Sequence, residues 1–149
     1  DIAPRFEFGF GLSYTTFAYS NLKLSEVVIP DTPTNSSESL PPGGHPSLWQ
    51  TSLTATYTVK NTGKLDGHEV SQLYLSYPEG SGEPPKVLRG FARTSLRRGQ
   101  SSTIKAQLRK RDLAVWDVVL QQWVVPAGEF TMSVGASSRD IHLTAKFTV

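Results

Sequence analysis

The chain has 149 residues and a formal net charge of +2, which suits a single domain and leaves no room for a second core of useful size. It contains no cysteine, which excludes disulfides, thiolate nucleophiles and cysteine-ligated metal sites. No apolar run approaches the roughly 18 residues of a membrane-spanning helix, so we expect no membrane partner.

Alternation of apolar and polar residues dominates the chain, and this period of two predicts β-strands with one buried face. The segments that show it are 17–24, 53–59, 70–77, 87–96, 104–108, 130–134 and 141–147. In the third segment we expect Leu73 and Leu75 on the core face, with Gln72 and Tyr74 on the opposite face. Glycine-, asparagine- and proline-rich turns separate the segments at sandwich-like spacing. The pattern predicts an all-β antiparallel sandwich of about seven strands.

Two stretches depart from this pattern. Residues 30–48 are rich in proline, glycine and serine and predict a long irregular loop, which in a compact domain is usually functional or disordered. The loop holds the sequon that begins at Asn35, a candidate N-glycosylation site if the chain is secreted. Residues 112–115 predict one helical turn, with Asp112 as its N-cap.

No catalytic, metal-binding or cofactor-binding residues are expected. The three histidines lack a second ligand at metal-like spacing, and no serine lies in a nucleophile motif. Paired carboxylates could serve glycoside hydrolysis. However, Asp66 is typical of a turn, Asp112 of a helix cap, and Glu69 and Asp117 of solvated or ion-paired groups.

Positive charge is concentrated in one segment. Residues 86–111 hold nine basic and no acidic side chains, whereas the rest of the chain holds 6 basic and 13 acidic ones. The two adjacent strands would then present a basic face that could bind an acidic surface or a polyanion. Alternatively, these side chains pair with acidic neighbours or are solvated turn residues. Nucleic acid is not expected, since Phe91 is the one aromatic in the segment. The candidate binding residues are Lys86, Arg89, Arg93, Arg97, Arg98, Lys105 and Arg109.

Four large aromatic residues are candidates for a sugar platform or for the core. Trp116 and Trp123 flank an apolar run, so we expect at least one of them in the core. We predict that Trp116→Ala destabilises the fold by the roughly 3–5 kcal/mol typical of emptying an aromatic core site. Trp49, beside the long loop, is expected to be exposed or to dock on another domain. Tyr77 joins Trp49 as a candidate for polymer binding.

Five motifs occur in order at residues 59–63, 72–75, 83–91, 111–117 and 134–140. They resemble the C-terminal fibronectin type III-like domain of family 3 glycoside hydrolases, and the long loop is most similar to that of the secreted fungal β-glucosidases. Residues 6–17 resemble the segment that leaves the second catalytic domain of the same enzymes. The resemblance implies an immunoglobulin- or fibronectin type III-like sandwich at residues 17–149. It also implies that residues 1–16 are a tail from a preceding catalytic domain, consistent with a chain that begins at Asp1 rather than Met.

The resemblance also implies what the chain itself does not do. In the family, the nucleophilic aspartate and the acid/base glutamate lie in two other domains, and no residue here inherits either role. The intact enzyme would hydrolyse β-glucosides such as cellobiose with retention. This chain would be a secreted accessory domain that stabilises the catalytic domains of the same polypeptide. The alternative is a module that binds lignin, cellulose or another glucan through basic and aromatic side chains.

Overall fold

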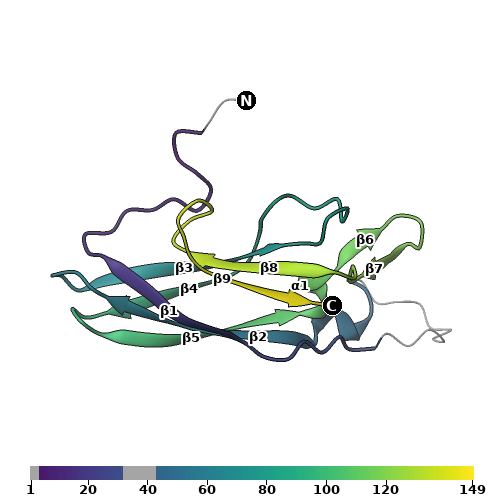
Figure 1. The fold of residues 1–149 in the computed structure, drawn as a ribbon, viewed down its shortest axis with the longest axis horizontal. Coiled ribbons are helices and arrows are strands. Elements are labelled where there is room, and N and C mark those ends of the chain that lie inside the picture. The colour runs from purple at the N-terminus through teal and green to yellow at the C-terminus, as the bar shows by residue number, and fades with distance from the viewer. Residues whose placement is uncertain (1–3, 32–42) are drawn as a thin grey trace.

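The computed structural model describes residues 4–31 and 43–149, which form two β-sheets packed face to face (Figure 1). Sheet A has the order β1-β2-β5, and it consists of β1 (Phe17–Leu24), β2 (Thr51–Asn61) and β5 (Ser101–Arg109). Sheet B has the order β4-β3-β8-β9, and it consists of β3 (Gly67–Ser76), β4 (Val87–Leu96), β8 (Glu129–Gly135) and β9 (Ile141–Thr148). All neighbouring strands are antiparallel.

Three short elements complete the described fold at one end of the sandwich. They are the 3₁₀ helix η1 (Pro46–Trp49), the single-turn helix α1 (Lys110–Leu113) and the hairpin of β6 (Val115–Asp117) and β7 (Gln122–Val124). No helix in the described residues is long and apolar enough to cross a membrane.

The predicted all-β sandwich is confirmed, and the seven predicted segments coincide with β1 to β5, β8 and β9. The β6–β7 hairpin was not predicted, because three-residue strands are too short to show alternation. The predicted N-cap was wrong: α1 begins at Lys110, and Asp112 accepts a hydrogen bond from the backbone N–H of Arg109 at 2.8 Å. Helix η1 occupies the end of the predicted loop, and Asn35 lies outside the described residues.

The core lies between the two sheets. Alternate residues of β2, β3 and β8 meet there, so the strand period accounts directly for the core. Tyr57 of β2 also donates to or accepts from Ser71 of β3 across the core, with 2.9 Å between the hydroxyl oxygens. The largest fully buried side chains are Leu53, Tyr57, Val59, Leu73, Tyr74, Leu75, Leu96, Leu108, Leu113, Phe130, Met132 and Val134.

The side chain of Asn61 forms a hydrogen-bond network at one end of the sandwich. Its buried side-chain oxygen accepts hydrogen bonds from the Thr15 hydroxyl at 2.9 Å and from the Gly63 N–H at 3.0 Å. Its Nδ2 donates to the carbonyls of Leu65 and Leu96 at 2.8 and 3.1 Å. One side chain therefore joins the chain before β1, the β2–β3 turn and the end of β4, with its polar atoms satisfied as burial requires.

Candidate interaction surfaces

Residues 4–14, here called the N-terminal segment, lie over the outer face of sheet B (Figure 1). The backbone N–H of Ser138, in the β8–β9 loop, donates to the carbonyl of Phe8 at 2.9 Å. The Gln72 amide, from β3, donates to the carbonyl of Gly9 at 2.9 Å. The segment has no strand ladder, so these contacts fix its course.

Glycine at position 9 permits this close approach. Gly9 has a φ of +81°, and an added Cβ would lie 2.0 Å from Gln72 Oε1 and 2.7 Å from the Tyr74 hydroxyl. Gln72 is only 6% exposed, and its amide also donates to the Ala136 carbonyl at 2.6 Å and accepts from Tyr74. Gln72 and Tyr74 thus point away from the core as predicted, but the N-terminal segment covers them.

A carboxylate provides a further contact between the segment and the sandwich. Glu7 Oε1 accepts a hydrogen bond from the Ser137 hydroxyl at 2.6 Å. This bond, then Glu7's own backbone N–H, and then the charge of Arg139 lower the pKa of Glu7 below its ordinary value of 4.5. The contact therefore favours the ionised form of Glu7.

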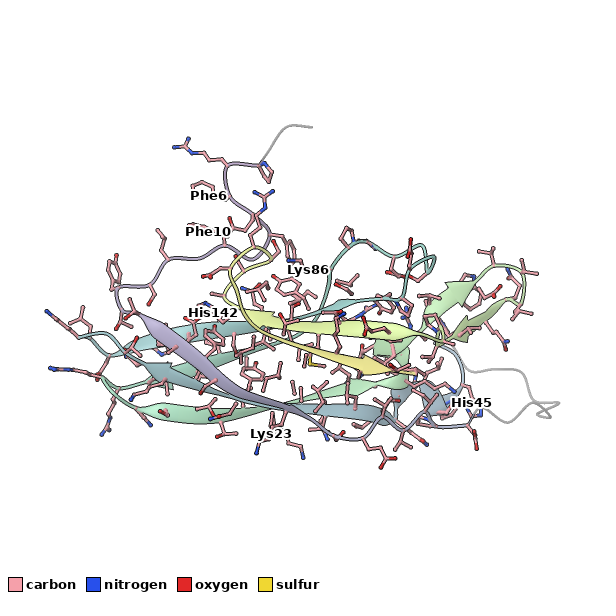
Figure 2. All side chains as sticks on the ribbon, viewed as in Figure 1. Phe6, Phe10, Lys23, His45, Lys86 and His142 are labelled. Carbon is pink, nitrogen blue, oxygen red and sulfur yellow. The ribbon has the colours of Figure 1, made fainter. Side chains whose placement is uncertain are left out.

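The N-terminal segment exposes apolar side chains on its free side. Tyr14 and Leu12 are 98% and 91% exposed. Figure 2 shows Phe6 and Phe10 on the part of the segment that stands above the sheets, and their ring centroids lie 4.9 Å apart. Large exposed apolar patches of this kind mark interaction surfaces. We call this surface the apolar strip, and it consists of Phe6, Phe8, Phe10, Leu12 and Tyr14.

A second surface is a groove between the β3–β4 loop and the β6–β7 hairpin. Its volume is about 530 Å³, within the range of small-molecule sites. Trp116 and Trp123 pack edge to face on the hairpin, with centroids 5.2 Å apart. The Arg111 guanidinium stacks on Trp123 at 3.2 Å from the ring centroid. The groove is lined by Ser81, Gly82, Glu83, Val87, Arg89, Arg111, Val115, Trp116 and Trp123.

Tyr77 supports the groove rather than forming an open platform. Its hydroxyl donates to the Asp112 carbonyl at 2.6 Å and accepts from Arg89 Nε at 2.9 Å. Its ring packs on Phe130 with centroids 5.4 Å apart, and burial raises the pKa of Tyr77. Tyr77 thereby holds the Arg89 guanidinium in position at the groove.

The expectation that at least one of Trp116 and Trp123 belongs to the core was wrong, because neither is part of the core cluster. Trp116 is 44% exposed, whereas its strand partner Trp123 is partly buried beneath Arg111. The apolar run between them forms the exposed hairpin turn, where Asp117 accepts from the backbone N–H groups of Val119 and Leu120. Apolar composition suggested burial, but the run spans a turn and not a strand.

The structure does not gather the predicted basic residues on one face. Strands β4 and β5 belong to different sheets, so Arg93 and Lys105 point outward on opposite sides of the sandwich. Lys86 donates a hydrogen bond to the Ser138 carbonyl at 2.7 Å, and Arg89 donates one to the Tyr77 hydroxyl. Arg97 and Arg98 are exposed on the β4–β5 turn.

Trp49 lies apart from the groove. It is 50% exposed at the end of η1, and the Arg109 guanidinium lies 5.7 Å from its ring centroid. The predicted exposure of Trp49 is thus confirmed, and Arg109 is the one predicted basic residue that joins it.

The four candidate carboxylates each accept a hydrogen bond from a different partner. The prediction that Glu69 is solvated or ion-paired was wrong, because Glu69 is buried and accepts a hydrogen bond from the Tyr19 hydroxyl. Burial and this carboxylate raise the pKa of Tyr19. Asp66 accepts from the Arg98 N–H at 2.8 Å beside its turn. Within residues 4–31 and 43–149, no group of three or more His, Asp or Glu residues could hold a metal ion.

Comparison with known proteins places the fold and its motifs in a family. Residues 69–138 match the family model described as "Fibronectin type III-like domain". The chain is 49% identical over its whole length to "Beta-glucosidase cel3A" of Pyricularia oryzae. The chain is a fibronectin type III-like domain of the kind found in family 3 β-glucosidases.

Solved structures give the same assignment for this fibronectin type III-like domain. A beta-D-glucoside glucohydrolase from Trichoderma reesei matches 99% of the chain with 47% identity and a TM-score of 0.88. A glycoside hydrolase family 3 β-glucosidase from Neurospora crassa matches 95% with 29% identity and a TM-score of 0.81. The domain spans only 20% of the Pyricularia and Trichoderma proteins and 26% of the Neurospora protein. It thus corresponds to a non-catalytic part of these enzymes, which confirms that the chain itself is not an enzyme.

Proposed function

We propose that this domain is an accessory domain that docks on the catalytic domains of its own polypeptide and stabilises them. The observation that supports this proposal is the apolar strip, whose side chains are exposed on a segment that Gln72 and Ser138 hold at Gly9 and Phe8. A fixed backbone limits the entropy lost when such side chains are buried by a partner.

The partner is argued from the comparisons. The domain accounts for 20% of the Pyricularia and Trichoderma proteins, so most of such a polypeptide lies outside it. The β6–β7 hairpin, with exposed Val118, Val119 and Leu120, rises on the same side of sheet B as the N-terminal segment (Figure 1). This side would face the remaining domains, and the parent activity would be hydrolysis of β-glucosides.

A domain exchange tests this function. The matching segment of the Pyricularia enzyme is replaced by this domain, and the half-life of β-glucosidase activity is measured at elevated temperature. We expect the exchanged enzyme to resist heat better than one that lacks the segment. Leu12→Ser with Tyr14→Ser should remove most of that gain, whereas Lys23→Ser, an exposed change on β1, should not. An exchanged enzyme that is indifferent to the double change would contradict docking through the apolar strip.

Polymer binding through Trp49 is the second candidate function. The half-exposed ring beside Arg109 is the observation that favours it. A pull-down on microcrystalline cellulose and on lignin, at low and high salt, compares the domain with its Trp49→Ala variant. Retention that depends on Trp49 would support this function, and salt-sensitive retention on lignin would indicate a charge contribution.

Secretion of the parent protein and glycosylation of Asn35 are part of the same proposal. The support is the sequon in a stretch rich in Pro, Gly and Ser. Protein secreted from a fungal host should lose mass on treatment with an N-glycosidase, and Asn35→Gln should abolish that loss. An unchanged mass would contradict glycosylation at this position.

A further inference from the structure

The groove between the β3–β4 loop and the β6–β7 hairpin contains two arginine side chains, Arg89 and Arg111. Within residues 4–31 and 43–149, neither of them forms an ion pair. In the same part of the chain, the Arg111 guanidinium makes its stacking contact with Trp123 but no hydrogen bond.

The two guanidinium groups also repel each other electrostatically. Burial, followed by the positive charge of Arg89, lowers the pKa of Arg111, and the acidic neighbours Asp112 and Glu83 offset this only in part. Both side chains are nevertheless fixed, Arg89 by the Tyr77 hydroxyl and Arg111 by Trp123. An anion in the groove would relieve this repulsion and would meet donors that are already positioned.

Trp116 adds a flat apolar surface beside these donors. Arg111 covers a face of Trp123, whereas Trp116 is 44% exposed and packs its neighbour edge to face. An exposed indole ring can stack on the C–H face of a pyranose ring, and an arginine fork can bind a carboxylate through two hydrogen bonds.

We propose that this groove binds a carboxylated pyranose, such as a glucuronic acid unit, with its ring on Trp116 and its carboxylate on Arg111. The volume of about 530 Å³ accommodates one or two sugar rings. Glu83, on the opposite wall, accepts hydrogen bonds from sugar hydroxyls but repels the carboxylate. This site uses no residue of the apolar strip.

The test uses two disaccharides that differ only at carbon 6 of one ring. Cellobiouronic acid carries a carboxylate where cellobiose carries a hydroxymethyl group. Each is titrated into the 149-residue chain at low salt, and binding is followed by NMR at the indole N–H of Trp116 and the Nε–H of Arg111. We expect cellobiouronic acid to bind at least about ten-fold more tightly, and this preference to shrink in high salt.

Variants then assign the contacts. Trp116→Ala should weaken binding of both sugars about ten-fold or more, whereas Trp49→Ala, a similarly exposed tryptophan outside the groove, should change it less than two-fold. Arg111→Lys should reduce the preference for the acid, because lysine keeps the charge but loses the fork. Glu83→Gln should strengthen binding of the acid several-fold and leave cellobiose unchanged. Circular dichroism melting confirms that each variant is folded.

Three outcomes would overturn the proposal. Equal affinity for the two sugars would exclude the role of the arginine pair. Equal losses from Trp116→Ala and Trp49→Ala would exclude this groove as the site. No binding of either sugar at tens of millimolar would exclude a sugar site and would leave the groove to a protein contact.

Discussion

The N-terminal segment and the β6–β7 hairpin both expose large apolar side chains, but the sandwich holds them by different means. The hairpin has its own backbone ladder, with Trp116 opposite Trp123, and a turn closed by Asp117. The segment has no ladder and is fixed largely by polar contacts from Gln72, Ser137 and Ser138. Single substitutions should therefore release the segment while leaving the hairpin in place.

The largest expected effect comes from removing the amide of Gln72. Gln72→Leu leaves the carbonyls of Gly9 and Ala136 without their donor, and loss of buried hydrogen bonds costs about 1–3 kcal/mol of unfolding free energy. Urea denaturation measures this loss. The matched control is Gln107→Leu, on the exposed side of β5, which should change stability by less than about 0.5 kcal/mol. An equal loss of stability in the two variants would show that the contacts of Gln72 with the N-terminal segment do not contribute to stability.

A smaller effect is expected where the segment meets the sheet. Gly9→Ala places a Cβ against Gln72 at a positive φ, at a cost of roughly 1–2 kcal/mol. Gly11→Ala is the control, since nothing lies within 4 Å of its added Cβ. Hydrogen exchange of the Ser138 amide, which donates to Phe8, should accelerate several-fold in the first variant only. Unchanged protection in Gly9→Ala would contradict the described contact.

A substitution in the β6–β7 hairpin should reduce the free energy of unfolding less than the substitutions at Gln72 and Gly9. Trp116→Ala is expected to cost less than about 1 kcal/mol, because the ring is half-exposed and its removal leaves no closed cavity. Urea denaturation gives the value. A loss near 3–5 kcal/mol, typical of an emptied aromatic core site, would mean that Trp116 is a core residue after all.

The smallest effect is a pH dependence confined to the segment. Because its pKa is lowered in the folded chain, ionised Glu7 stabilises the segment fully above pH 4.5, and this contribution is lost as the pH falls through the folded pKa. NMR titration of the Glu7 carboxyl carbon should give a midpoint below 4.5. Ser137→Ala should return the midpoint toward 4.5, and a midpoint unaffected by this change would contradict the Ser137 contact.

Period-two alternation predicted the sandwich because β2, β5 and β9 each bury mainly one face. At β3 it assigned Gln72 and Tyr74 correctly to the face away from the core, but it did not reveal that a segment more than 60 residues away in the chain buries them. No local pattern reveals such a contact, although the glycine at position 9 between two aromatic residues is a signal of close approach.

The interaction surfaces were harder to predict. The basic residues cluster in the sequence, but a crossover between sheets separates β4 from β5 and scatters them. The groove arises where Arg111, after β5, meets a hairpin too short to show periodicity. For the N-terminal segment, the family resemblance predicted a tail from a preceding domain, but it did not place that tail against sheet B.

The most direct test of docking is the solvent exposure of the apolar strip. Hydroxyl-radical footprinting compares Tyr14 and Phe6 in the 149-residue chain with the same residues in the exchanged Pyricularia enzyme. Both are exposed in the chain alone. We predict that their oxidation falls several-fold in the exchanged enzyme, while that of Phe91, exposed on β4, serves as an internal reference. Equal oxidation of Tyr14 and Phe6 in the two proteins would contradict docking through this surface.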